Sequence, residues 1–258
     1  MSKNFILAHD LGTTGNKASL YDREGNVLAG SFYGYRTEYP RVNWVEQNPD
    51  DWWQAVCVST QKLLNETKVP ASEIACIAFS GQMMGCVAID REAHPLRNAI
   101  IWADQRGVEE AKYLIDKAGE ETTYRITGHR ASPSYSGAKI LWVRNHQPEI
   151  FAETHKFVHA KDFIVARLTG SFVTDYSDAS GMNLYDLQAK DWSDLILEGI
   201  QLDREQLPDL HASTDVVGEV VSNVAAEVGL APGTPVVIGG GDGSCAAVGA
   251  GVVQEGSA

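Results

Sequence analysis

The chain has 258 residues, 44% hydrophobic and 21% charged, which excludes a disordered, collagen-like or coiled-coil protein. No apolar run reaches the about 18 residues that a membrane-spanning helix requires, so we expect no membrane partner. The net charge is -13, from 34 acidic and 21 basic residues. Because non-specific nucleic-acid binding depends on lysines and arginines, we expect no nucleic-acid partner.

The cysteines and the N-terminus indicate the compartment. Cys57, Cys76, Cys86 and Cys245 include no Cys-x-x-Cys pair and fit no zinc site. Cys57 and Cys76 lie in apolar stretches, which is typical of small core residues. The first four residues lead directly into a strand pattern and do not resemble a signal peptide. We therefore expect a reduced, cytoplasmic protein.

The first 35 residues predict an antiparallel β-meander. Apolar or alternating strands are expected at residues 5–8, 17–21 and 27–33. The first strand ends at Asp10, and a turn rich in glycine and threonine connects it to the second.

The rest of the chain alternates helices with strands, which predicts an α/β fold. Asn48 is a helix-capping residue, Pro49 follows it, and apolar residues recur at helical spacing to Thr67. The continuous apolar run at residues 74–79 suits a buried parallel strand. Further strands are expected at 86–89, 99–101 and 235–238, helices at 108–118, 138–145, 161–168, 220–228 and 244–250, and a polar loop at 175–185.

The turn after the first strand, DLGTTGNK at residues 10–17, has residues suited to a phosphate. Glycines let backbone N–H groups approach an anion, the hydroxyls of Thr13 and Thr14 can donate to its oxygens, and the Asp10 carboxylate can hold Mg²⁺ through water. The motif is not a Walker A loop, because it leads into a strand and not a helix. An ordinary hairpin explains these residues equally well.

The segment SGQMMG at residues 80–85 directly follows the buried strand. The carboxyl ends of strands in α/β sheets are where ligands commonly dock. Gln82 could hydrogen-bond a polyol, and Met83 could pack on the carbon face of that polyol. Taken alone, the segment is more simply a loop with two core methionines.

Residues 102–106, WADQR, combine an aromatic ring, a carboxylate and a guanidinium group after another apolar strand. Sugar sites often use such a set, because charged groups can bridge vicinal hydroxyls while a ring packs on the sugar face. Trp102, Asp104 and Arg106 are therefore candidate sugar contacts. The alternative is a helix start, with Asp104 as N-cap and Arg106 on a solvated face.

Asp242 stands between the last predicted strand and a helix of small residues. A carboxylate at a helix N-terminus is favoured in its ionised form, so Asp242 could accept a proton from a hydroxyl. Asp242 could also merely cap the helix. The segment formally matches the dinucleotide motif G-x-G-x-x-A, but an acid inside that turn would repel a pyrophosphate.

The remaining polar residues give weaker signals. Asp175 and Asp178 lie in the polar loop, where we interpret Asp178 as a turn or capping residue. The seven histidines include no H-x-x-x-H pair and there is no G-x-S-x-G motif, so metal-hydrolase and serine-hydrolase sites are not expected.

Together and in this order, five stretches resemble the N-terminal domain of the FGGY family of carbohydrate kinases, and most of all its xylulose kinases. The resemblance covers the whole chain and implies a ribonuclease-H-like fold of the actin, hexokinase and Hsp70 superfamily, a mixed sheet flanked by helices. It also implies that residues 1–258 form the sugar-binding domain and that the ATP-binding domain is absent from this chain. The five stretches are DLGTTGNKA (10–18), SGQMMG (80–85), WADQR (102–106), TDYSDASGMNLYD (174–186) and GGGDGSCAAVGAG (239–251).

The resemblance implies an enzyme that uses Mg²⁺ and ATP to phosphorylate a sugar hydroxyl. It implies that Asp242 is the catalytic base and that homodimers can form. The residues implied to contact ATP are Asp10, Gly12, Thr13, Thr14 and Lys17, with Asp10 near the metal ion, and those implied to contact the sugar are Gln82, Met83, Trp102, Asp104 and Arg106.

One departure from the family pattern leaves the substrate open. Xylulose kinases typically have Met-His where this chain has Met83-Met84, so D-xylulose competes with other pentuloses, polyols and aldonates. Two further hypotheses remain. The chain could be a sugar-binding half-protein without catalysis, or an actin-like ATPase that does not phosphorylate sugar, although the candidate sugar contacts argue against the ATPase.

Overall fold

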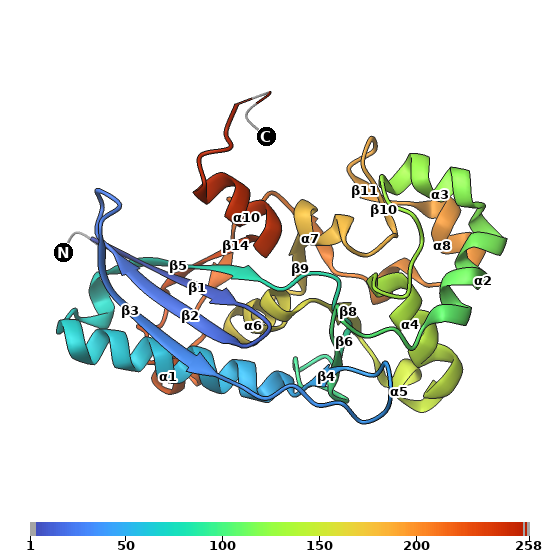
Figure 1. Ribbon diagram of the computed structural model, residues 1–258. Coiled ribbons are helices and arrows are strands. Elements are labelled where there is room, and N and C mark those ends of the chain that lie inside the picture. Colours follow the sequence, from blue (N-terminus) through green and yellow to red (C-terminus); the bar gives the residue numbers. More distant parts are fainter. Residues whose placement is uncertain (1–3, 255, 257–258) are drawn as a thin grey trace.

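The computed structural model describes residues 4–254 and 256. Its centre is a six-stranded mixed sheet in the order β13-β14-β5-β1-β2-β3 (Figure 1). β1 is parallel to β5, and β5 to β14, whereas β2, β3 and β13 run antiparallel to their neighbours. The six strands are β1 Phe5–Leu11, β2 Gly15–Tyr21, β3 Val27–Gly34, β5 Ile74–Gly81, β13 Val216–Glu219 and β14 Pro235–Gly241.

Helices cover one face of this sheet. α1 (Pro49–Thr67) runs along β2 and β3 and contacts α6 and α9, and α6 (Ala160–Thr169) packs against β14 and β5 (Figure 1). The side chain of Asn48 caps α1 by accepting the N–H of Asp50, as the sequence predicts. α10 (Asp242–Gly249) lies on the opposite face (Figure 1). α9, which contacts α1, spans Ser222–Val228.

A second group of helices lies beside the sheet and has its own apolar core. α2 packs between α4 and α8, and short two-stranded ladders connect this region to the main sheet (Figure 1). Its helices are α2 Val108–Ala118, α3 Glu120–Thr127, α4 Ser136–His146, α5 Pro148–Glu153 and α8 Asp194–Ile200. The ladders pair β4 Glu46–Gln47 with β7 Ala99–Ile100, β6 Val87–Ile89 with β8 Lys156–Val158, β9 Val173–Asp175 with β12 Asp209–His211, and β10 Tyr185–Asp186 with β11 Asp191–Trp192. The 3₁₀ turns are Ala71–Glu73 and Arg204–Gln206.

The predicted β-meander, α1, the buried strand β5 and the strand–helix unit at β14 and α10 are all confirmed. The polar loop predicted at residues 175–185 is wrong. A short helix, α7 (Tyr176–Ser180), forms there because the Asp175 carboxylate accepts the N–H groups of Ser177 and Asp178 and caps it. Cys57 is buried as expected, whereas Cys76 is only partly buried.

Among the described residues, no helix combines the length and the hydrophobicity that crossing a bilayer requires.

Candidate active site

The carboxyl ends of the three parallel strands meet at one edge of the sheet. Asp10 on β1 is in register with Ser80 on β5, and Gly241 on β14 is in register with Gly81. An open cleft at this edge is lined by Asp10, Ser80, Asp242 and two residues of α10. The structure therefore brings Asp10 and Asp242, predicted from motifs more than 200 residues apart, to the same cleft.

The β1–β2 turn is a tight hairpin that leaves polar groups at its tip. The N–H of Gly12 donates to the Gly15 carbonyl at 3.1 Å. A Cβ on Gly15 would lie 2.6 Å from the Tyr33 carbonyl oxygen, so this position requires glycine. The Thr14 side chain is exposed, and Lys17 forms a loose, solvent-exposed pair with Asp10 at 3.8 Å. The hairpin interpretation is confirmed, and it leaves hydroxyls and a cation beside the Asp10 carboxylate.

Asp242 is the first residue of α10, and its side chain is exposed. Although the residue is exposed overall, desolvation of part of its carboxyl raises the pKa above the ordinary value, and the negative charges of Asp178 and Asp10 add to the effect. The expectation that the helix N-terminus favours the ionised form is therefore wrong. A carboxylate with a raised pKa is a better proton acceptor. Gly241, not Asp242, is the N-cap residue of α10, and the Asp242 carboxylate accepts the N–H of Gly243 at 2.8 Å. Asp242 is therefore not the capping residue of α10.

The loop after β5 presents Gln82 and Met83 toward this edge. Gln82 is buried and donates to Gln47, while its own carbonyl oxygen has no hydrogen-bond partner among the described residues. Met83 packs against Gly241, where an added Cβ would lie 2.5 Å from the Met83 sulfur. Met84 has a left-handed backbone (φ 59°), and its carbonyl accepts the ammonium group of Lys139 at 2.9 Å. The segment is a loop, as predicted, but its two methionines are partly exposed and are not core residues.

The three candidates at residues 102–106 occupy different environments. The ring of Trp102 is 42% exposed, and its N–H donates to the Thr13 hydroxyl at 2.9 Å. Asp104 is fully buried and accepts the backbone N–H of Val45 at 2.6 Å and the guanidinium of Arg106 at 2.7 Å.

The alternative of a helix start at Asp104 is wrong. α2 begins at Val108 with Gly107 as its N-cap. Only 1% of the Arg106 side chain is exposed, and its guanidinium lies over the Trp44 ring at 3.9 Å. Asp104 and Arg106 thus form a buried ion pair, and the guanidinium is also enclosed by aromatic rings and by Glu46 at 2.7 Å.

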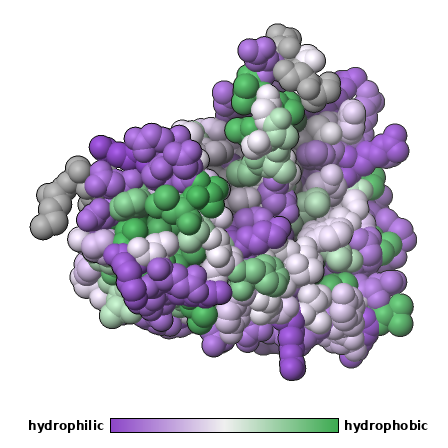
Figure 2. Space-filling view, turned by 60° about the vertical axis from the view of Figure 1, so that its left-hand side comes forward, coloured by the Kyte–Doolittle hydropathy of each residue, from purple (hydrophilic) through white to green (hydrophobic). Residues whose placement is uncertain are grey.

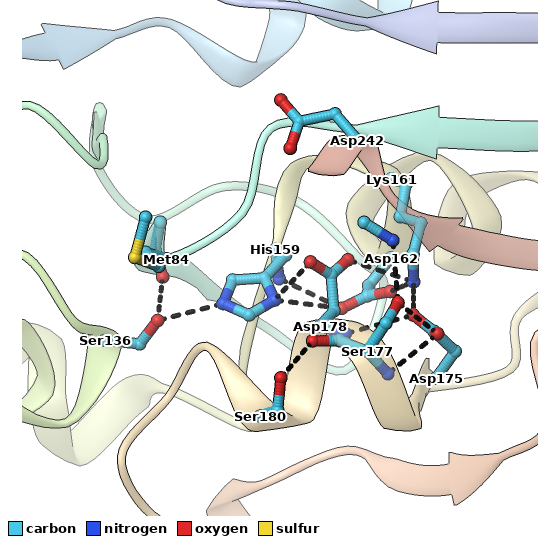
Figure 3. A network of polar contacts seen from close by, with 12 residues as sticks. Met84, Ser136, His159, Lys161, Asp162, Asp175, Ser177, Asp178, Ser180 and Asp242 are labelled. Atoms are coloured by element: carbon cyan, nitrogen blue, oxygen red, sulfur yellow. Dashed lines mark hydrogen bonds and ion pairs between the residues drawn. The ribbon is translucent and has the colours of Figure 1, made fainter. Parts of the chain in front are cut away.

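A buried charge network that the sequence analysis did not predict lies beneath the cleft (Figure 3). The Lys161 ammonium lies 2.6 Å from Asp162, 2.9 Å from Asp175 and 3.1 Å from Asp178. All four side chains are 0–1% exposed. The interpretation of Asp178 as a turn residue is therefore wrong, since its carboxylate is a fully buried ion-pair partner.

His159 extends this network. Its Nδ1 lies 3.4 Å from Asp178 and its Nε2 lies 2.9 Å from the Ser136 hydroxyl (Figure 3). Burial is the largest single effect and disfavours the imidazolium, but the charge and hydrogen bond of Asp178 together with the charge of Asp162 outweigh it and raise the His159 pKa above its ordinary value. The sequence does contain a signal for this network, because Lys161 and Asp162 are adjacent charges at the start of a helix whose next four residues are apolar.

Three places among the described residues could hold a metal ion. The first, formed by Asp90, Glu92 and His94, is at least partly exposed and does not line the cleft. His159, Asp162 and Asp178 also lie close enough to share a metal ion. However, the Lys161 ammonium already pairs with the carboxylates of Asp162 and Asp178, so these side chains do not need a metal cation to balance their charge. Asp10 and Asp242 instead line an open cleft, and exposed carboxylates suit Mg²⁺ that retains several waters.

We compared the chain with known proteins. Residues 5–249 match the N-terminal domain of the FGGY family of carbohydrate kinases. The chain belongs to this family. The FGGY relatives include the xylulose kinase of Bacillus subtilis, 36% identical over 252 residues, which cover 98% of this chain and 50% of that protein. They also include a gluconokinase of Bacillus licheniformis, 32% identical over 98% of this chain and 49% of that protein.

The fold class is confirmed by solved FGGY kinases. A ligand-bound xylulose kinase from Lactobacillus acidophilus superimposes with a TM-score of 0.88 at 28% identity, covering 96% of this chain and 50% of that one. The fold is that of the actin, hexokinase and Hsp70 superfamily. The chain spans about half the length of the curated relatives that it matches.

Proposed function

We propose that the chain is the sugar-binding and catalytic half of an ATP-dependent carbohydrate kinase, with Asp242 as the base. The observation that supports this proposal is the cleft that Asp10 and Asp242 share at the ends of β1 and β14. A base for a sugar hydroxyl and a carboxylate for the metal ion of the nucleotide must face the same space.

The chemistry follows from these positions. Mg²⁺-ATP would supply the phosphoryl group, and the metal would offset its negative charge. Asp10 would hold the metal through water, while Gly12, Thr13, Thr14 and Lys17 would contact the phosphates. Asp242 would orient the sugar hydroxyl and take its proton as the oxygen bonds to phosphorus and ADP leaves. The raised pKa of Asp242 favours that transfer.

The sugar would lie between the loop after β5 and Trp102. Trp102 is 42% exposed, whereas the unpaired carbonyl oxygen of Gln82 is buried and would have to be uncovered before it could accept a sugar hydroxyl. Asp104 and Arg106, although predicted as sugar contacts, are enclosed in this structure and would hold the loop that carries Trp102 in place. Both xylulose kinases and a gluconokinase are relatives. A pentulose is therefore the first substrate to test, and an aldonate the second.

The test joins this chain to the second half of the Bacillus subtilis xylulose kinase, because the chain spans half of that relative. ADP release is measured with D-xylulose, other pentuloses, polyols and gluconate. We expect turnover with at least one of them, and a loss of about 10²-fold or more in kcat for Asp242→Asn with sugar binding retained. Asp194→Asn, an exposed carboxylate on α8, is the matched control.

Two outcomes would contradict the proposal. Wild-type turnover by Asp242→Asn would remove Asp242 as the base. Sugar binding without turnover by any joined protein would favour a non-catalytic sugar-binding half-protein. We expect the 258-residue chain alone to bind sugar weakly and not to turn over.

A further inference from the structure

The backbone that carries Asp242 departs from a regular strand. Pairing between β14 and β5 shifts between Val237 and Gly240, and Gly239 has a left-handed backbone with φ 72°. A Cβ on Gly239 would lie 1.6 Å from the Phe79 carbonyl oxygen, so the bulge brings the two strands into direct backbone contact. Pairing with β5 resumes at Gly240 and Gly241, and further contacts of these two residues help to set the direction of the chain that follows.

One of those contacts comes from a side chain. The N–H of Gly241, the residue before Asp242, donates to the Ser177 hydroxyl oxygen at 2.9 Å. Ser177 is on α7, and this bond joins the start of α10 to a helix more than 60 residues earlier in the chain.

Asp175 holds the Ser177 hydroxyl in a single orientation. The Ser177 hydroxyl donates to Asp175 Oδ2 at 2.6 Å, so its lone pairs remain available for the Gly241 N–H. The same carboxylate accepts the N–H of Ser177 and the hydroxyl of Ser213, and its other oxygen lies 2.9 Å from the Lys161 ammonium (Figure 3). Burial alone would raise the Asp175 pKa, but Lys161 and these hydroxyls hold it below the ordinary value.

The network reaches the opposite wall of the site as well. From Lys161 it continues through Asp178 and His159 to Ser136, whose hydroxyl donates to the Gly85 carbonyl at 2.6 Å (Figure 3). Gly85 belongs to the loop after β5 that carries Gln82 and Met83. Buried charge networks of this kind often contribute less to stability than apolar residues would, so a role in fixing geometry is a reasonable explanation for this one.

We propose that Ser177 is a positioning residue for Asp242. The buried Lys161–Asp175 pair fixes the Ser177 hydroxyl, which accepts the Gly241 N–H and so sets the direction of the Asp242 side chain. This inference rests on the proposed role of Asp242 as the base. Ser177 acts through the Gly241 backbone and touches neither substrate nor nucleotide in this scheme.

The test compares Ser177→Ala with Ser177→Thr and with Ser180→Ala. Threonine keeps the hydroxyl. Ser180 is on the same helix, but its hydroxyl donates to the Ser177 carbonyl at 2.7 Å and not to Gly241. Because the N–H of Ser177 still caps α7 through Asp175, we expect Ser177→Ala to fold, with a urea midpoint close to that of Ser180→Ala.

Two readouts separate positioning from mere stability. In the 258-residue chain, hydrogen exchange at the Gly241 amide should accelerate at least about 10-fold in Ser177→Ala and stay slow in the other two variants. In the joined protein, Ser177→Ala should lower kcat about 10-fold with little change in the sugar KM, and Ser177→Thr should restore most of it.

The outcomes distinguish this inference from the proposed function. Suppose that Asp242→Asn is inactive, but that Ser177→Ala stays within twofold of Ser180→Ala in both Gly241 amide exchange and kcat. This result overturns the inference about Ser177 and leaves the proposed function standing. Wild-type turnover by Asp242→Asn overturns the base assignment, and the inference falls with it.

Discussion

The indole nitrogen of Trp102 lies 2.9 Å from the hydroxyl oxygen of Thr13. This contact joins the loop after β7 to the β1–β2 turn, so the candidate sugar contacts and the candidate phosphate turn are coupled before any ligand binds. Trp102 is 42% exposed. Figure 2 shows that polar and apolar residues are mixed over one face of the molecule. A sugar stacked on the ring would thus lie close to the phosphate turn.

Trp102→Phe keeps an aromatic ring and removes the N–H donor. A hydrogen bond of this kind contributes about 1 kcal/mol, so we expect sugar affinity to fall about 5-fold by isothermal titration calorimetry. Thr13→Val removes the same bond and should give the same loss. The urea midpoints should change little, because Trp102 is partly exposed. Unchanged affinity in both variants would show that this contact does not position the ring.

Lys161→Met should destabilise the fold strongly. The substitution leaves Asp162, Asp175 and Asp178 buried without their cation. Removing one partner of a buried ion pair costs about 3–5 kcal/mol in unfolding free energy, measured by urea denaturation. Lys112→Met is the matched control, since its pair with Glu109 is exposed and should contribute less than about 1 kcal/mol. Equal effects of the two substitutions would contradict the importance of the network.

Gly239→Ala should destabilise the strand that carries Asp242. Its left-handed backbone and the 1.6 Å approach to the Phe79 carbonyl leave no space for a Cβ, so we expect a loss of at least about 2 kcal/mol. Gly243→Ala is the control, because a Cβ there meets nothing within 4 Å and alanine favours the helix by up to about 1 kcal/mol. Urea midpoints measure both changes. A tolerated Gly239→Ala would mean that the bulge can rearrange.

Buried His9 should make the chain sensitive to acid. Burial lowers its pKa to about 4, although the side chain of Asn16 opposes the shift. The unfolded chain binds this proton below pH about 6.5 and the folded chain only near 4, so stability is full above 6.5 and is lost as the pH falls through this window. The loss approaches about 3 kcal/mol.

The measurement is the unfolding free energy of the wild type and of His9→Gln between pH 7 and 4. His9→Gln should have a shallower pH dependence than the wild type, while His94→Gln, at an exposed position, should retain the wild-type slope. Parallel slopes in all three proteins would contradict a neutral, buried His9.

Local patterns were enough to predict most secondary structure and the principal site candidates. Strand and helix periodicity depends on neighbouring residues, which is why β1, α1, β5 and the β14–α10 junction follow from the sequence. Asp10 and Asp242 were identifiable because turn chemistry surrounds each of them. The prediction of a loop at 175–185 is wrong, because composition does not show that the Asp175 carboxylate accepts two backbone N–H groups and caps α7.

The tertiary structure alone decided which charges are buried and which face the cleft. Lys161 lies on a helix and its partners Asp175 and Asp178 more than ten residues later, so no local pattern links them. The sequence predicts a solvated or sugar-facing Arg106, yet aromatic rings from distant segments enclose it. The sequence by itself determined the order of the elements and the chemistry at the strand ends. Long-range packing determined their environment, since desolvation and ion pairing depend on residues that the fold brings together.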